Sequence, residues 1–99
     1  MVRVNWTTQA VSDLKGIREY IAKDSVKYAD LQVTRIRTKT QLLKTNPLAG
    51  RSVPEINAPR IREIFEGNYR IIYKVVTKDR VDILTIHHSA RDLGRRKID

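Results

Sequence analysis

The sequence predicts an α+β fold of two layers, in which an N-terminal strand and an antiparallel helix hairpin precede a three-strand antiparallel meander. Apolar and polar side chains alternate over residues 2–6, and again in three segments between residues 60 and 88, as on half-buried strands. The stretch between them carries apolar residues at spacings of three and four, which are typical of amphipathic helices. Helices grouped beside a mostly antiparallel sheet pack as a two-layer sandwich.

The first helix is expected to follow directly on the strand at residues 2–6. Thr7 or Thr8 can cap it, because a threonine hydroxyl accepts a hydrogen bond from a free backbone N–H of the first turn. The apolar stripe of this helix comprises Ala10, Leu14, Ile17 and Ile21. This stripe predicts one face that packs against the sheet.

A second helix is expected after Lys23, capped by Asp24 or Ser25. Its stripe comprises Ala29, Val33, Ile36, Thr40 and Leu43. Asn46-Pro47 ends it, because the residue before a proline is disfavoured in helical conformation. The short connection between the two helices predicts an antiparallel hairpin.

The C-terminal half is expected to form a loop and then three strands. Residues 47–59 contain all three prolines and predict an irregular loop. The strands are expected at residues 60–66, 69–77 and 81–88, and Gly67-Asn68 forms a two-residue turn between the first two. Residues 89–99 form a polar, basic tail, and the whole chain, 1–99, is expected to be a single domain.

Alternation along the strands divides the sheet into a core face and an opposite face. The core face is expected to carry Tyr69, Ile71, Tyr73 and Val75. The opposite face is expected to carry the basic residues Arg70, Lys74 and His87 and the apolar residues Ile72 and Ile83, and if Phe65 points into the core, Arg62 and Ile64 join them. Exposed isoleucines among cations predict a partner-binding surface. The alternative is an ordinary solvated sheet face.

The charge of the chain predicts an anionic partner. The formal net charge is +9, and twelve of the twenty cationic residues are Arg, whose planar fork suits phosphate and carboxylate. The chain has no Cys, no signal-peptide pattern and no apolar run near the roughly 20 residues of a membrane span. We therefore expect a cytoplasmic protein with no membrane partner.

Metals and cofactors are not expected. His87 and His88 are adjacent on a strand and point to opposite faces, so they cannot share one metal ion. The four glycines are scattered along the chain and form no phosphate-binding loop.

Motifs in a fixed order along nearly the whole chain carry a family resemblance. They are Trp6–Ala10, Asp13-Leu14, Ile17, Tyr20-Ile21, Pro47, Gly50-Arg51, Pro54-Glu55, Arg62-Glu63, Tyr69–Tyr73, Ile83, His87 and Ala90-Arg91. Together they resemble the ParE/RelE toxins of type II toxin–antitoxin systems. The resemblance implies the same two-layer fold, growth arrest, a role in plasmid stabilization, and a cognate antitoxin that binds across the toxin in a hetero-oligomer. Arg91 joins the expected partner-binding residues.

The family acts on two targets, and both remain as hypotheses. ParE-type members inhibit DNA gyrase without being hydrolases, whereas RelE-type members cut mRNA in the ribosomal A site. In the RNA-cleaving hypothesis, Glu55 is the base, Arg62 and Arg70 hold the phosphate, and His87 is the acid. In the structural alternative, Glu55 pairs with Arg51, and Arg70 pairs with Glu66.

The sequence favours gyrase for two reasons. The segment from His87 to Leu93 resembles the ParE branch, and the single Phe and Trp are expected to be buried rather than exposed for stacking on RNA bases. Nucleic-acid binding without toxicity stays as a third hypothesis.

Overall fold

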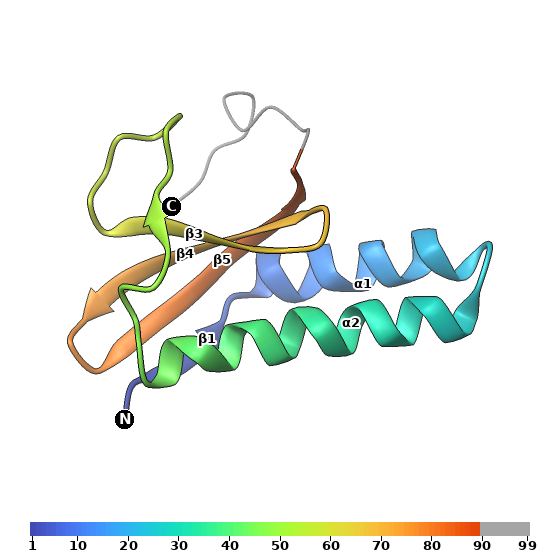
Figure 1. Cartoon of the computed structure of the whole chain (residues 1–99), viewed down its shortest axis with the longest axis horizontal. Coiled ribbons are helices and arrows are strands. Elements are labelled where there is room, and N and C mark those ends of the chain that lie inside the picture. Colours follow the sequence, from blue (N-terminus) through green and yellow to red (C-terminus); the bar gives the residue numbers. More distant parts are fainter. Residues whose placement is uncertain (90–99) are drawn as a thin grey trace.

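The computed structural model describes residues 1–89 and has the predicted α+β architecture. Its elements are β1 (Arg3–Trp6), α1 (Thr8–Ala22), α2 (Val26–Gln41), the 3-10 turn η1 (Leu42–Lys44), β2 (Arg51–Ser52), β3 (Ile61–Glu66), β4 (Tyr69–Thr77) and β5 (Arg80–His88). The strand order in the described part is β1-β5-β4-β3-β2, and the two helices lie together on one face of the sheet (Figure 1). The expected basic tail, with Arg91, lies beyond Ser89 and outside the described residues.

Both helices begin at capping residues that the sequence predicts. The Thr7 hydroxyl accepts a hydrogen bond from the backbone N–H of Ala10 at 3.2 Å, and the Ser25 hydroxyl accepts one from Tyr28 at 3.1 Å. Within residues 1–89, neither helix is long and apolar enough to cross a membrane.

The sheet is mixed rather than purely antiparallel. β1 pairs in parallel with the first half of β5, from Arg3 beside Arg80 to Trp6 beside Ile83. Beyond Trp6 the chain leaves the sheet as α1, whose Asp13 side chain lies against the edge of β5. The Asp13 carboxylate accepts hydrogen bonds from the backbone N–H of Ile86 at 3.1 Å and from the hydroxyl of Thr85. Helix α1 thus covers the edge that β1 leaves unpaired.

The predicted turn between β3 and β4 is confirmed. Glu66 and Tyr69 face each other across it, and Gly67 has a φ of 57°, which glycine adopts without steric cost.

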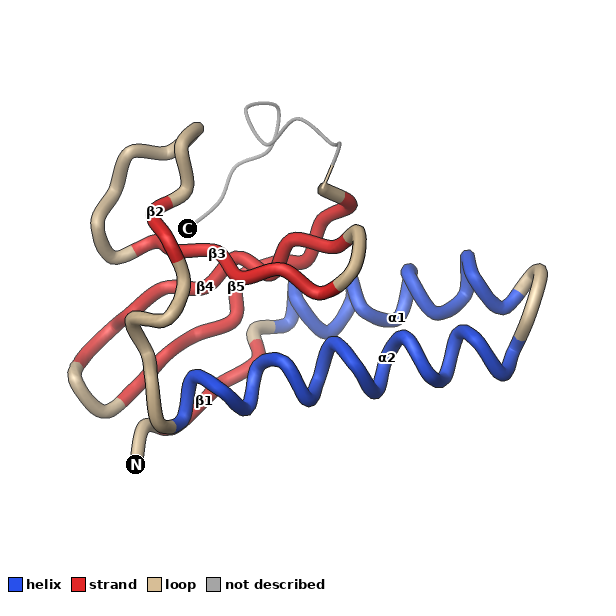
Figure 2. The backbone as a smooth tube through the Cα atoms, in the orientation of Figure 1, coloured by secondary structure: helices blue, strands red, loops and turns tan. Residues whose placement is uncertain are grey.

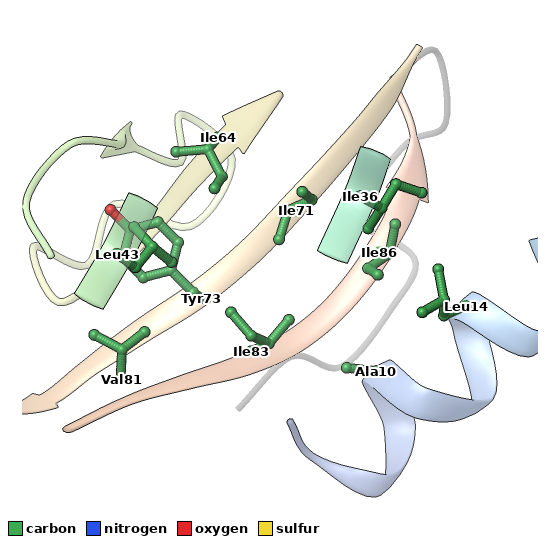
Figure 3. Packing of buried hydrophobic residues seen from close by; sticks show 10 residues of the cluster. All are labelled: Ala10, Leu14, Ile36, Leu43, Ile64, Ile71, Tyr73, Val81, Ile83 and Ile86. Carbon is green, nitrogen blue, oxygen red and sulfur yellow. The ribbon is translucent and has the colours of Figure 1, made fainter. Parts of the chain in front are cut away.

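The main core lies between the helices and the sheet (Figure 3). Its buried members are Ala10, Leu14, Ile36, Leu43, Ile64, Ile71, Tyr73, Val81, Ile83 and Ile86. A smaller cluster of Val53, Ile61 and Ile72 lies on the opposite face of the sheet. The segment after β2, which lies on the side of the sheet away from the helices (Figure 2), contributes Val53, Ile56 and Ala58 to this packing. The opposite face is therefore partly covered, and the expectation of an open face is wrong.

Three of the isoleucines expected on that open face are buried. Ile72 lies in the smaller cluster, beneath Val53. Ile64 pairs with Ile71, so it points toward the helices and not away from them. Ile83 also points toward the helices, because the register shifts between Ile72 and Tyr73 and reverses the alternation along β5.

Arg62 and Phe65 lie on the opposite faces from those expected. Arg62 pairs with Tyr73 and shares the helix-facing side of the sheet, whereas Phe65 pairs with Arg70 on the other side and is 38% exposed. The expectation failed because it assigned Phe65 to the core on its apolar character alone. Tyr20 and Tyr28 on the helices are exposed as well, so the expected lack of exposed aromatics is also wrong.

Candidate functional site

Arg70 is the centre of an ion network on the helix-free face of the sheet. It lies near the start of β4, and its side chain is 8% exposed. Its Nε donates to Oε1 of Glu63 at 2.9 Å, and its Nη2 donates to the same oxygen. Its Nη1 and Nη2 also donate to Glu55, at 2.8 and 3.0 Å. All three guanidinium nitrogens therefore donate to carboxylates.

Glu63 joins Arg70 to a second arginine. Its side chain is fully buried on β3, and its Oε2 accepts a hydrogen bond from Nε of Arg51 at 2.7 Å. Arg51 lies directly across from Glu63, where the short β2 pairs with β3. Its exposed guanidinium also lies over the ring of Phe65, 5.5 Å from the ring centre. A buried carboxylate is stable in this position because two arginines supply donors to it.

Glu55 belongs to the segment that folds back over the sheet. The hydrogen bond from Arg70 lowers the pKa of its carboxyl to about 2, against an ordinary value of 4.5. The same contact, with the neighbouring Glu63, raises the pKa of Arg70. At neutral pH the pair is fully ionised, and Glu55 has little tendency to take up a proton.

His87 lies beside this network. It pairs with Arg70 across the β4–β5 ladder and is 2% exposed. Three of the four predicted catalytic residues, Glu55, Arg70 and His87, are thus brought to one face. The fourth, Arg62, lies on the other face, where its Nη1 donates to the backbone oxygen of Gly50 at 2.7 Å.

The predicted partner-binding residues are divided between the two faces of the sheet, with Arg70, Ile72 and Lys74 on the helix-free face. Arg62 and Arg70 lie on opposite faces, while Ile64, Ile72 and Ile83 are buried and cannot contact a partner in this conformation. Lys74 lies half-buried beside the smaller cluster, and Arg91 is outside the described residues.

Glu63 and Arg51 belong to the network, although the sequence patterns did not predict them as members. Glu63 stands between Ile61 and Phe65 with the same parity, and this alternation places all three on one face of β3. A buried carboxylate needs a cation beside it. The position of Glu63 between two apolar residues of the same strand face therefore could have predicted an ion pair there. The structural alternative, in which Glu55 pairs with Arg51 and Arg70 with Glu66, named the wrong partners, because the ion pairs are Glu55–Arg70 and Glu63–Arg70.

The chemistry open to this site is limited by the ion pairs. A general base is most effective when its pKa lies near the working pH, and the pKa of about 2 makes Glu55 a weak one. A phosphate could reach Arg70 only by displacing Glu55, because both outer nitrogens already donate to it. In residues 1–89, no three His, Asp or Glu side chains are grouped as metal ligands would be.

Comparisons with known proteins converge on one family. The family model described as the ParE toxin of the type II toxin–antitoxin system parDE matches residues 4–93. Toxin RelE2 of Caulobacter vibrioides is 32% identical over 91 residues, which cover 92% of this chain and 99% of that protein. The putative toxin Y4kP of Sinorhizobium fredii is 34% identical over 87 residues, covering 88% of each.

Two solved structures have a similar fold. A chain of the chromosomal ParDE toxin–antitoxin system from P. aeruginosa superposes with a TM-score of 0.72 at 22% identity, covering 89% of this chain and 96% of that one. A chain of the RelBE2 toxin–antitoxin complex from Mycobacterium tuberculosis gives a TM-score of 0.57 at 24% identity, with 88% and 96% covered.

Proposed function

The chain belongs to the ParE toxin family of type II toxin–antitoxin systems, and from this membership we propose that it inhibits DNA gyrase without catalysing RNA cleavage. As a toxin of such a system it has a cognate antitoxin, which holds it inactive. The proposal places the protein in the cytoplasm, where gyrase acts on the chromosome.

The observation that carries this proposal is the pairing of Glu55 with Arg70. Metal-free cleavage at a ribose 2′-hydroxyl needs a base to take the proton and free cations around the phosphate. Here the candidate base and the candidate cation are bound to each other through two hydrogen bonds, and the pKa of Glu55 is about 2. In this conformation the Glu55 carboxylate and the outer nitrogens of Arg70 bind each other, so neither group is available to a substrate.

RNA cleavage in the ribosome is the alternative, and one observation favours it. Glu55, Arg70 and His87 lie on a single face of the sheet, although they come from a loop and two strands. Movement of the loop that carries Glu55 would free Arg70 and leave His87 beside it. Three exposed aromatic residues, Tyr20, Tyr28 and Phe65, also weaken the sequence argument against RNA.

Two assays on the purified chain separate the targets. We expect inhibition of gyrase supercoiling on relaxed plasmid, with accumulation of cleaved DNA, and intact mRNA in a translating ribosome extract. Glu55→Gln should keep the inhibition if its role is structural. Cleavage of mRNA in the A site that disappears with Glu55→Gln and His87→Asn, together with uninhibited gyrase, would replace the proposal with the alternative.

A further inference from the structure

The helix hairpin projects past the end of the sheet (Figure 1). A groove lies between the helices and the ends of β4 and β5. One part, of about 480 Å³, lies between α1 and the ends of β4 and β5 and is lined by Gly16, Tyr20, Tyr69 and His88 among others. A second part, of about 250 Å³, continues it toward α2 and is lined by Tyr28, Gln32 and Arg35. Tyr69 and His88 line both parts, so the two parts adjoin each other at these side chains.

Gln32 is the unusual residue in this groove. It is 5% exposed on α2, and its Nε2 has no hydrogen-bond partner in the described part of the chain. A buried amide donor without an acceptor is costly, because it has lost its water and gained nothing in exchange. Gln32 lines the groove, but Nε2 itself is shielded from solvent, so the side chain must turn for an acceptor on a bound molecule to reach it.

The walls of the groove are aromatic and rich in hydrogen-bond donors. Tyr69 packs edge-on against His88, with ring centres 5.8 Å apart. Burial raises the pKa of Tyr69, and so does the proximity of Tyr28 and Tyr20. Tyr20 lines the first part beside Tyr69, and Tyr28 lines the second.

The size and charge of the groove select the kind of occupant. At Gly16 an added Cβ would meet no atom within 4 Å, which leaves room for a partner side chain against α1. Arg35 and Glu66 line the second part, and Asp13 lines the first, where no Lys or Arg of residues 1–89 is found. A nucleic acid backbone needs a row of cations, so these walls suit a protein segment with apolar side chains and hydrogen-bond acceptors better. The net charge of +9 adds attraction for an acidic protein.

We propose that a segment of the cognate antitoxin fills this groove and presents a carboxylate or carbonyl oxygen to Nε2 of Gln32, so that Gln32 selects the cognate antitoxin. A segment without an acceptor at this point would leave the amide unpaired in the complex and would bind more weakly. The inference rests on the toxin–antitoxin part of the proposed function and not on gyrase as the target.

Binding of the full-length chain to the protein encoded by the adjacent antitoxin gene tests this inference by surface plasmon resonance. Gln32→Leu keeps much of the side-chain shape and removes the donor. We expect it to speed dissociation about tenfold or more with little change in association. Thermal unfolding of the free variant should be unchanged or shifted upward, because the unpaired donor is gone. A purely structural glutamine would instead lose stability and keep its affinity.

Two further variants complete the experiment. Gly16→Leu fills the groove while improving helix propensity, so we expect weaker antitoxin binding without loss of stability. Gln41→Leu, at the exposed end of α2, is the matched control and should bind within twofold of the parent.

Two outcomes would overturn the inference. One is unchanged antitoxin affinity in both groove variants, and the other is a parent chain that does not bind the antitoxin. Groove variants that alter self-association or gyrase inhibition while antitoxin affinity stays the same would assign the groove to another occupant. If gyrase is not inhibited but antitoxin binding depends on Gln32, the proposal that gyrase is the target is wrong, and the assignment of the groove to the antitoxin is supported.

Discussion

Glu55 and Arg70, 15 residues apart in the chain, are joined by two parallel hydrogen bonds of 2.8 and 3.0 Å. The pair connects the segment after β2 to the middle of the sheet, because Glu55 belongs to that segment and Arg70 to β4. Val53, beside it in the same segment, is buried against Ile61 and Ile72. An apolar contact and an ion pair therefore hold the same segment against the strands, and each can be tested separately.

Acid should weaken the contact between Glu55 and Arg70. The pKa of Glu55 is lowered from 4.5 to about 2 in the folded chain, so its contribution to stability is fully present above pH 4.5. This contribution is lost as the pH falls from about 4.5 to about 2, because folded and unfolded states then bind the proton equally. We expect Glu55→Gln to lower the free energy of unfolding at pH 6, measured by urea titration, and to differ little from the parent near pH 2.

Other carboxylates with a lowered pKa, such as Asp82, are present in both the variant and the parent. The difference between their free energies of unfolding therefore reports on Glu55 alone. Asp30→Asn, at an exposed ion pair with Arg18, is the control and should give a small difference at both pH values. A loss for Glu55→Gln that is the same at pH 6 and pH 2 would show that the charge is not what stabilises the contact.

Glu63→Gln should be far more destabilising than the loss of an exposed carboxylate. Glu63 is fully buried and accepts from both Arg51 and Arg70, so its neutralisation leaves Arg70 with Glu55 alone. Removing one partner of a buried ion pair costs roughly 3–5 kcal/mol, and the remaining Glu55 contact favours the lower end, about 3 kcal/mol. Urea unfolding checks the value, with Glu19→Gln on the exposed face of α1 as the control. Equal effects of the two substitutions would contradict a role for Glu63 at the centre of the network.

Gly50 and Tyr73 form a tight contact that no larger residue fits. The Tyr73 hydroxyl accepts from the backbone N–H of Gly50 at 2.9 Å and donates to the oxygen of Pro47 at 2.9 Å. A Cβ on Gly50 would lie 2.4 Å from the backbone oxygen of Glu63 and 2.7 Å from the Tyr73 hydroxyl. We expect Gly50→Ala to cost about 3 kcal/mol through overpacking, and Tyr73→Phe about 1–3 kcal/mol through unpaired polar groups.

The double variant distinguishes these two causes. Tyr73→Phe removes the hydroxyl but leaves the oxygen of Glu63 in place, so it should not rescue Gly50→Ala. Thermal unfolding of the single and double variants measures this. Recovery of parental stability in the double variant would mean that the hydroxyl alone excludes a side chain at residue 50.

Local patterns predicted the elements of the fold well. Thr7 and Ser25 begin helices, and Gly67 turns a hairpin, because each acts through backbone atoms a few residues away. Parity also placed Arg70 and His87 together on one face, and they do pair across β4 and β5. These relations need only the neighbours of each residue in the chain.

The errors arose where distant segments decide the outcome. The register shift beside Ile72 reverses the alternation of β5, and nothing near Ile83 in the sequence marks it. The covering of Ile72 depends on a loop that returns over the sheet and contributes Val53. Arg62 and Phe65 were each predicted on the wrong face, because the apolar Phe65 was assigned to the core. In the structure Phe65 lies on the outer face, where the guanidinium of Arg51 covers its ring. The ion network required knowing that Glu55 returns to Arg70, which the spacing along the chain does not reveal.

The edge of β5 provides the last prediction. Asp13 on α1 accepts from the backbone N–H of Ile86 at 3.1 Å and from the Thr85 hydroxyl, while its other oxygen accepts from Gln9 at 2.8 Å. Asp13→Ala would leave a backbone donor and a hydroxyl of β5 unpaired, which should cost about 1–3 kcal/mol. Amide hydrogen exchange at Ile86 should accelerate more than exchange at Ile71 in the centre of the sheet, because the edge loses its cover locally.

Asp30→Ala removes a carboxylate of the same size from an ion pair whose side chains are 43% and 61% exposed, so it should change stability by less than about 1 kcal/mol. If the two alanine variants lose the same stability and Ile86 exchanges as in the parent, then α1 packs beside β5 without protecting its edge.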